Sequence, residues 1–558
     1  MLSASSLGSV ALLSTVAILQ STSLQTGAAA SSADPYQAVH WVEGGPFHWT
    51  SCFNSTAPDQ AKFRCGYLDV PLDHTNKSDT RTARIATVLL QAGRSKSNRT
   101  VLFNPGGPGE SGTGDLFEEA DELVQYVNGT GADILAFDPR GVNMTTPQMS
   151  CYEDDAFRAS YYFSASASRE CRDPDAQMLL ADSYNKALMQ ACRDRLGDLP
   201  RFVNTVAVAK DMDLIREALG EEETDALVFS YGTDLFITYS QLFPNRVGRV
   251  VLQAITDQPH QAKLDLLGIE NSADVNDVFY KGFITNCVRV GPSRCPFANA
   301  VATVKKTDAA SALNQTYWDL IHRLETNPFA AASSTFGPAL ITSQVALLFT
   351  YGSLYDTDDF PVLGQVLDDL NNGNGTSIID EFIGGVYRDF MQGNKGVQGW
   401  PGVEVQKTTG YDATLLTTCA DAAEHIQRDY QWWRNLSMTL YSQSRLGASA
   451  NFDYIFACRH FDWDVTEVLT GPLNARLKHP MLLIGSAYDP TTPYFSAERM
   501  LDQLGQGNAR LVQAHGFGHG AQLPNTCVIQ LANAVFANGT LPSAAHTDCH
   551  PDTLPFDS

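Results

Sequence analysis

The sequence has no run of lysine or arginine, and its 38 basic residues are outnumbered by 62 acidic ones, which gives a formal charge of −24. A chain without a basic patch cannot neutralise phosphate groups, so nucleic acids and anionic membrane surfaces are not expected partners. No apolar run after the first thirty residues is long enough to span a bilayer. The remaining composition, 44% hydrophobic and 18% charged, is typical of a soluble globular protein.

The N-terminus resembles a secretory signal. Residues 10–19 form a short apolar core and Ala28–Ala30 offer small side chains for cleavage, although no lysine or arginine precedes the core. A membrane anchor is the alternative, but the core is too short to span a bilayer. We expect a signal peptide over residues 1–30 and a secreted protein.

Cysteines and glycosylation sequons also indicate export. Eleven cysteines are many for a cytosolic enzyme, and none falls in a Cys-x-x-Cys metal or redox pair. Nine Asn-x-Ser/Thr sequons indicate a glycoprotein, at Asn54, Asn76, Asn98, Asn128, Asn143, Asn314, Asn374, Asn435 and Asn538. Short loops favour three disulfides, with Cys419–Cys458 as a further candidate: Cys52–Cys65, Cys287–Cys295 and Cys527–Cys549. Of Cys151, Cys171 and Cys192, one must then stay unpaired. We favour a buried, unreactive thiol for this cysteine over a catalytic nucleophile.

Short β-branched runs alternate with helical periodicity along the first part of the chain. The runs lie at 83–90, 100–103, 133–137, 226–229 and 249–252, and a helical pattern over 206–219 ends at Gly220. This alternation predicts an α/β fold with a mostly parallel sheet covered on both faces. It breaks down between 262 and 475, where helical patterns and loops dominate, and returns with strands at 481–485 and 509–513. We expect a core over 31–261 and 476–558, interrupted by a mainly helical cap over 262–475.

Ser230 directly follows the apolar run 226–229. It begins the tripeptide Ser-Tyr-Gly, after which a helical pattern starts. A buried strand, a sharp turn carrying serine and a following helix are typical of a nucleophile elbow. A serine hydroxyl needs a base to take its proton and a third group to orient that base. Asp489 follows the strand at 481–485, and His519 lies in a glycine-rich loop after the next strand. His515 competes with His519 but lies at the strand end, with less freedom to reach a serine.

The glycine-rich segment 104–112 follows the strand at 100–103 directly. Acyl transfer places negative charge on a carbonyl oxygen, and backbone N–H groups must point at it. We assign one such donor to the N–H of Gly107 and the other to the N–H of Tyr231. A phosphate-binding loop is the alternative, but the Gly-Lys-Ser/Thr ending is absent.

These motifs together resemble the secreted tripeptidyl aminopeptidases, which are α/β-hydrolases related to prolyl iminopeptidases. The matching segments include 104–109, 137–141, 230–233 and the Asp489 and His519 loops, and further matches extend from about residue 45 to the C-terminus. The resemblance implies serine-dependent hydrolysis of peptide substrates from the N-terminus, under a helical cap, without a metal or other cofactor. The oligomeric state is left open.

The resemblance also assigns roles. Ser230 is the expected nucleophile, His519 the general base and then acid, and Asp489 the group that orients His519. An exopeptidase needs carboxylates to hold the substrate's α-ammonium group. Asp421 and Glu110 are the candidates, with an ordinary surface or structural role as the alternative for each.

Three positions depart from the family pattern. Val228 stands where the elbow normally has its first glycine, Glu110 where another glycine is frequent, and Gln253 where aspartate is common. A branched side chain at position 228 would crowd the turn, and a displacement of about 1 Å can cost on the order of a hundredfold in rate. Beside the aminopeptidase, two hypotheses therefore stay open: an esterase or lipase with the same triad, and a binding protein that keeps the fold without catalysis.

Overall fold

The structure is a computed structural model that describes residues 46–52, 62–91, 99–168, 174–386, 400, 409–422, 428–520 and 524–557. The expected signal peptide, the sequons at Asn54 and Asn98, and Cys171 lie outside this part of the chain. Among the helices of the described ranges, none has the length and apolar character needed to cross a bilayer.

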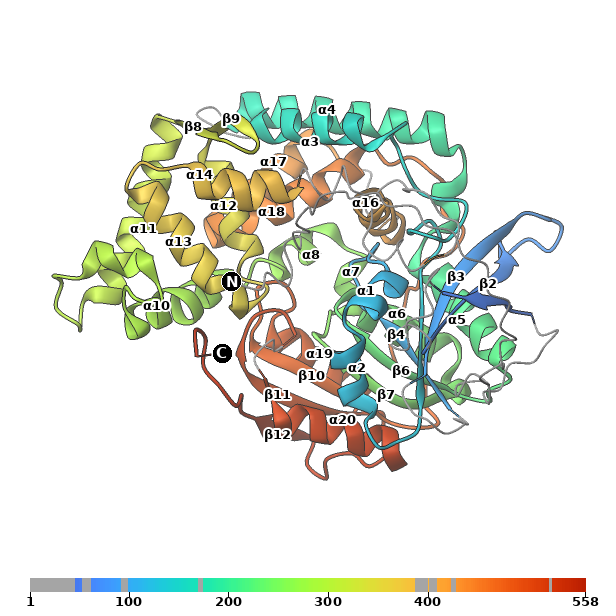
Figure 1. The fold of residues 1–558 in the computed structure, drawn as a ribbon. Coiled ribbons are helices and arrows are strands. Elements are labelled where there is room, and N and C mark those ends of the chain that lie inside the picture. The colour runs from blue at the N-terminus through green and yellow to red at the C-terminus, as the bar shows by residue number, and fades with distance from the viewer. Residues whose placement is uncertain are drawn as a thin grey trace, which may run out of the picture.

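A ten-stranded sheet forms the centre of the described chain, in the order β1-β2-β3-β5-β4-β6-β7-β10-β11-β12 (Figure 1). Neighbours from β5 to β12 pair in parallel, whereas β1, β2, β3 and β5 pair antiparallel. The prediction of a mostly parallel sheet is confirmed. The strands are β1 (His48–Ser51), β2 (Phe63–Pro71), β3 (Thr82–Leu90), β4 (Thr100–Asn104), β5 (Asp133–Phe137), β6 (Thr224–Phe229), β7 (Val247–Gln253), β10 (Met481–Tyr488), β11 (Ala509–Phe517) and β12 (His546–Cys549).

Helices cover both faces of the sheet, which is why its central strands consist of buried residues almost without interruption. On one face, strand side chains pack with α1 (Gly112–Glu118), α2 (Ala120–Val127) and α20 (Thr526–Asn538). On the other face they pack with α5 (Thr205–Leu219), α6 (Tyr231–Leu242) and α19 (Tyr494–Leu504). Because parallel strands end at one edge, this arrangement gathers the loops after β4, β6, β7, β10 and β11.

The ends of α5 illustrate how local sequence sets these elements. The side chain of Asn204 accepts a hydrogen bond from the N–H of Ala207 and so caps the first turn. Gly220 ends the helix in the left-handed conformation at φ 73°, which a residue without Cβ adopts at low cost. The helix predicted over 206–219 is therefore present: it begins one residue earlier, at Thr205, and ends before Gly220 as expected.

The segment between β7 and β10 is mainly helical, as predicted. Its elements are α7 (Gln258–Gln261), α8 (Leu264–Glu270), α9 (Val275–Asp277), η3 (Val278–Ile284), α10 (Thr285–Val290), η4 (Pro296–Val301), α11 (Ala309–Thr326), β8 (Phe329–Ser333), β9 (Gly337–Ile341), α12 (Ser343–Gly352), η5 (Thr357–Asp359), α13 (Phe360–Asn371), α14 (Thr376–Ile378), η6 (Ile379–Ile383), α16 (Gly410–Asp421), α17 (Tyr430–Gln443), α18 (Arg445–Phe456) and η9 (Ala457–His460). Residues 275–379 supply nearly all of a second hydrophobic core. By contrast, α16 and α17 pack against the core that includes the sheet.

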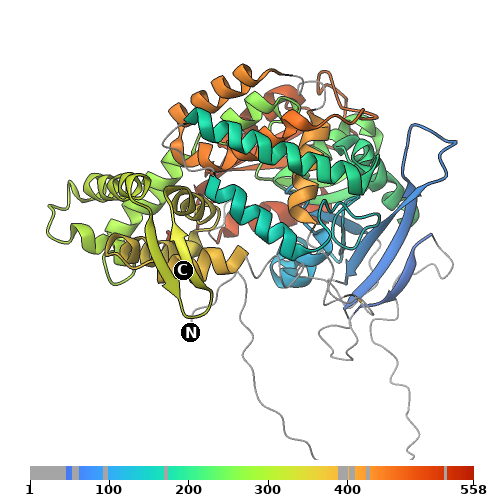
Figure 2. The same ribbon diagram turned by 90° about the horizontal axis from the view of Figure 1, so that it is seen from above.

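A second helical excursion lies between β5 and β6, where the sequence predicted only core. It contains α3 (Asp155–Ser168), α4 (Pro174–Leu196) and η1 (Leu199–Phe202). Both views place α4 beside α17 (Figures 1 and 2), and Arg434 of α17 pairs with Asp175 of α4 at 2.5 Å. The helical cover therefore comes from two insertions rather than one, while the exact domain boundaries stay a prediction.

Five disulfides link cysteines within the described residues. The three favoured pairs and Cys419–Cys458 are all present, and Cys151 pairs with Cys192. The Cys151–Cys192 bridge closes the loop that contains α3 and most of α4. It links the segment before α3 covalently to the C-terminal part of α4.

Candidate active site

Ser230 lies between β6 and α6 with φ 53° and ψ −127°. A positive φ is rare for a residue with Cβ and costs on the order of 1–3 kcal/mol, so its surroundings must hold it there. The Ser230 N–H donates to the carbonyl of Gln253 at 3.0 Å. The Ser230 carbonyl accepts from the N–H and the hydroxyl of Thr233, at 2.8 and 2.7 Å. The turn thus has the strained geometry of a nucleophile elbow.

Val228 fits this elbow because Gly232 lacks a Cβ. Val228 is fully buried in β6 and pairs in register with Asn104 on one side and Leu252 on the other. A Cβ on Gly232 would lie 3.2 Å from the Val228 Cβ and 2.8 Å from the carbonyl oxygen of Asn104. Asn104 and Val228 together leave no room for a Cβ at position 232, and the glycine there lets the turn accept the valine at position 228.

Asp489 and His519 form a hydrogen-bonded pair. His519 Nδ1 lies 3.0 and 3.1 Å from the two carboxylate oxygens of Asp489, which is fully buried. Burial alone would raise the pKa of Asp489, but the charge and hydrogen bond of His519, with the N–H groups of Thr492 and Thr491, hold it below its usual value. The carboxylate is therefore positioned to orient and charge-stabilise the imidazole.

A chain of contacts joins this pair to the elbow. Ser230 donates to the backbone of Gln253, and the side-chain amide of Gln253 donates to the carbonyl of Gly520. The Gly520 N–H in turn donates to Asp489 Oδ2 at 2.9 Å. Ser230, Asp489 and His519 thus lie at the carboxyl edge of the adjacent strands β6, β7, β10 and β11. Gln253, which departs from the family pattern, links the histidine loop to the elbow.

The glycine-rich loop after β4 packs directly on the elbow. A Cβ on Gly106 would lie 2.8 Å from the Ser230 Cβ and 3.0 Å from the Tyr231 nitrogen, and Gly106 has φ 115°. Gly107, the expected oxyanion donor, is exposed and has φ 104°. The loop and the first N–H of α6 therefore lie side by side next to the serine.

Asp138 holds the neighbouring loop through a buried network. Its carboxylate accepts hydrogen bonds from Ser111, Thr113 and the N–H of Met144, and from the side-chain amide of Asn143. Asn143 is fully buried and its amide nitrogen also donates to Ser111. The sequon at Asn143 thus lies in the core, where a folded chain has no space for a glycan.

The two carboxylates expected to bind the substrate's α-ammonium group differ in their surroundings. Glu110 is exposed on the loop that follows Gly107. Asp421, at the end of α16, accepts hydrogen bonds from the N–H and hydroxyl of Thr205 at 2.8 and 2.6 Å. Burial raises the pKa of Asp421 to about 7, although the Thr205 hydrogen bonds lower it. Both substrate roles stay predictions.

Residues from the helical insertion also reach the site, and the sequence analysis missed them. The N–H of His519 donates to the carbonyl of Tyr355 at 2.8 Å, and the Tyr355 ring packs edge-on against the imidazole at 5.2 Å. Thr414 of α16 donates to the carbonyl of Pro108 in the glycine-rich loop. No sequence signal marks either residue, because both contacts depend on how the insertion folds back over the sheet edge.

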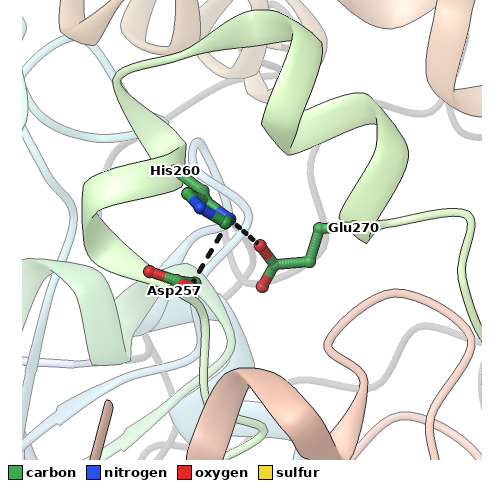
Figure 3. Close-up of side chains that lie close together, drawn as sticks. All are labelled: Asp257, His260 and Glu270. Atoms are coloured by element: carbon green, nitrogen blue, oxygen red, sulfur yellow. Dashed lines mark hydrogen bonds and ion pairs between the residues drawn. The ribbon is translucent and has the colours of Figure 1, made fainter. Parts of the chain in front are cut away.

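A separate cluster of titratable groups lies where β7 leads into the insertion. Asp257, His260 and Glu270 each offer one ligand atom within 4.8 Å of the others (Figure 3). His260 Nδ1 lies 2.6 Å from Glu270, while Arg499 of α19 lies 2.7 Å from His260 Nε2 and 2.8 Å from Asp257. The guanidinium thus supplies the positive charge that a metal ion would bring. The expectation of a reaction without metal stays a prediction.

Replacing Arg499 by methionine is expected to reduce the free energy of unfolding by about 1–3 kcal/mol at pH 7, because the buried carboxylate of Asp257 loses its cation. Burial and the neighbouring Glu270 already raise the pKa of Asp257. A carboxyl with a raised pKa is penalised only while ionised, so the loss should shrink as the pH falls towards 5. Denaturant unfolding at both pH values measures this loss, with Arg434→Met as control, because the carboxylate that Arg434 pairs with, Asp175, is exposed. An equal loss at the two pH values would contradict a charge effect.

Comparison with known proteins agrees with this geometry. Residues 99–284 match the model of the alpha/beta hydrolase fold, and residues 447–549 match that of the TAP-like proteins. The tripeptidyl aminopeptidase of Streptomyces lividans is 25% identical over 91% of this chain and 87% of its own length. Serine protease Hip1 of Mycobacterium tuberculosis is 29% identical over 60% of this chain and 62% of its own. Carboxylesterase B of the same species is 26% identical over 88% of each chain.

The fold and its strand-end loops define the chain as an α/β-hydrolase. Within that superfamily it groups with the TAP-like serine peptidases, to which it is related over nearly its whole length.

Proposed function

We propose that this protein is a secreted aminopeptidase that releases short peptides from polypeptide N-termini through an acyl-enzyme. The observation that carries the proposal is the pair of buried Asp489 and half-buried His519, tied through Gly520 and Gln253 to the backbone of Ser230. The relationship to the tripeptidyl aminopeptidase of Streptomyces lividans supports the choice of reaction.

In the proposed mechanism His519 takes the proton of Ser230 as the hydroxyl attacks the scissile carbonyl. Asp489 keeps the Nδ1–H tautomer and stabilises the imidazolium that forms. The N–H groups of Gly107 and Tyr231 hold the oxyanion, and Tyr231 supplies its N–H from the start of α6, where the helix dipole adds to it. His519 then protonates the leaving amine, and water releases the short peptide by the same steps in reverse order.

Recognition of a free N-terminus is assigned to Glu110 and Asp421. An α-ammonium group beside a carboxylate in a partly dry site gains a charge-assisted hydrogen bond that a blocked peptide lacks. The esterase hypothesis has one specific support, the relationship to carboxylesterase B, because the same triad serves ester hydrolysis.

The test uses a fluorophosphonate probe and three substrate types. The parent protein is expected to be labelled at Ser230, and Ser230→Ala to lose both labelling and at least about 10³-fold of the turnover. Tripeptide amides with a free N-terminus should be cleaved much faster than N-acetylated ones. Glu110→Gln should reduce the ratio of these two cleavage rates. A folded protein that resists the probe would end the serine-hydrolase proposal. Equal cleavage of blocked and free peptides would end the exopeptidase proposal, and cleavage of simple esters alone would favour the esterase.

The disulfide bonds support the proposed secretion. The five disulfides of the described residues are typical of proteins that fold in an oxidising compartment. Together with the signal-like N-terminus, they are the grounds for proposing secretion.

A further inference from the structure

The glycine-rich loop is held between two surfaces. Gly106 packs on the elbow, as described above, and Gly109 packs on the first turn of α16. A Cβ on Gly109 would lie 2.6 Å from the carbonyl oxygen of Gly410 and 2.7 Å from both the nitrogen and the hydroxyl oxygen of Thr414. The side chain of Thr414 also hydrogen-bonds the carbonyl of Pro108. The backbone that contains Gly107 therefore lies between the serine turn and a helix of the insertion.

The other end of α16 is linked through Thr205 to the side chain of Tyr231, whose N–H is the second proposed oxyanion donor. Asp421 binds Thr205 through both of its oxygens, and the Thr205 hydroxyl lies 2.5 Å from the hydroxyl of Tyr231. Tyr231 is buried and follows Ser230 directly. One helix thus contacts the Gly107 loop at its start and, through Thr205, the Tyr231 side chain at its end.

Three buried links hold α16 in place. Asp412 is fully buried, pairs with Arg158 of α3 at 2.7 Å and accepts the N–H of Cys151 at 2.7 Å. Thr409, just before the helix, accepts the N–H of Asn143 at 2.7 Å. Cys419 forms a disulfide with Cys458. The links to α3 and to η9 fix the helix independently of the glycine-rich loop, whereas the link through Asn143 joins it to the Asp138 network that also holds Ser111.

From this arrangement we infer that α16 is a positioning element for the oxyanion hole, with Thr414 as its principal contact. The inference rests on the proposed function and deepens it. Donors to an oxyanion act only when they are aimed before the charge develops, and loss of one donor costs about 10²–10³-fold in kcat. A side chain that fixes the donor loop, without touching substrate, therefore acts on kcat while leaving ground-state binding alone.

The experiment replaces Thr414 by valine, which keeps the shape and removes the hydroxyl. We expect kcat for a tripeptide amide to fall about tenfold or more, with KM within about twofold. Affinity for a tripeptide aldehyde, whose adduct carries an oxyanion-like oxygen, should fall in parallel. Thr414→Ser should restore most of both, because it returns the hydroxyl.

Two further readouts separate this inference from the proposed function. Thr439→Val of α17 is the matched control, because Thr439 is exposed. The hydroxyls of Thr439 and Thr414 each hydrogen-bond the backbone carbonyl four residues earlier in their own helix, so both variants lose that bond. Fluorophosphonate labelling measures oxyanion stabilisation without any peptide, so slower labelling of Thr414→Val supports the inference even if no peptide is cleaved. Unchanged kcat and labelling in folded Thr414→Val would overturn it, as would a rise in KM alone. A parent protein that is neither labelled nor active would overturn both the inference and the proposed function.

Discussion

Replacing Asp489 by asparagine is expected to lower kcat by roughly three to four orders of magnitude, with KM nearly unchanged. The Asp489 carboxylate accepts hydrogen bonds from three backbone N–H groups and lies beside Nδ1 of His519. An amide has only one acceptor oxygen, and its NH₂ group would face donors or favour the wrong imidazole tautomer. Steady-state kinetics with a tripeptide amide that has a free N-terminus measure kcat and KM of the parent protein and of Asp489→Asn.

The control is Asp502→Asn on α19, an exposed position that undergoes the same change of charge. It should leave kcat unaltered. If folded Asp489→Asn retained kcat within tenfold of the parent value, Asp489 would not be the acid of the site, and the assignment of His519 as base would lose its orienting partner.

Replacing Gly232 by alanine is expected to reduce kcat at least about a hundredfold, because a displacement near 1 Å at the nucleophile has that cost. The new Cβ would lie 2.8 Å from two oxygens of Asn104, so either the end of β4 or the serine turn must move. Val228→Gly should keep its turnover at the parent level or above it, while losing about 2–4 kcal/mol of stability from a fully buried side chain.

The double variant Gly232→Ala/Val228→Gly tests which neighbour limits the turn. It should recover only part of the activity, since the Asn104 backbone still blocks the alanine methyl. Gly352→Ala is the matched control, because an added Cβ at this exposed helical glycine meets no atom within 4 Å. Full activity of Gly232→Ala would contradict the steric account, and full recovery in the double variant would assign the limit to Val228.

The sequence predicted the elements whose physics is local. Strand runs such as 133–137 and the helix at 206–219 carry their periodicity and their end signals within a few residues, and the structure has them there. Three disulfides also followed from short loops, and the further candidate Cys419–Cys458 is present as well. The excursion with α3 and α4 was missed, because nothing local distinguishes a helix that covers the sheet from one that joins the insertion.

At the site, chain order and loop chemistry predicted Ser230, Asp489 and His519, and the structure brings their strand ends to one edge. Val228 was expected to crowd the serine turn because the sequence motif treats position 228 without regard to position 232. The meaning of position 228 depends on position 232, and on the Asn104 backbone beside both, which no linear motif expresses. Thr414 and Tyr355 could not be found in the same way, since their contacts arise from tertiary packing.

The pairing of β7 with β10 has a consequence for biosynthesis. These strands are neighbours in the sheet, with Val251 opposite Leu482, although the whole helical insertion separates them along the chain. During synthesis the serine and the glycine-rich loop emerge long before the aspartate and the histidine. Closing so long a loop is slow, so we expect the pairing to form late in folding. A nascent or truncated chain then carries the proposed nucleophile without its proposed base, so we expect no peptidase activity until the last strands have docked.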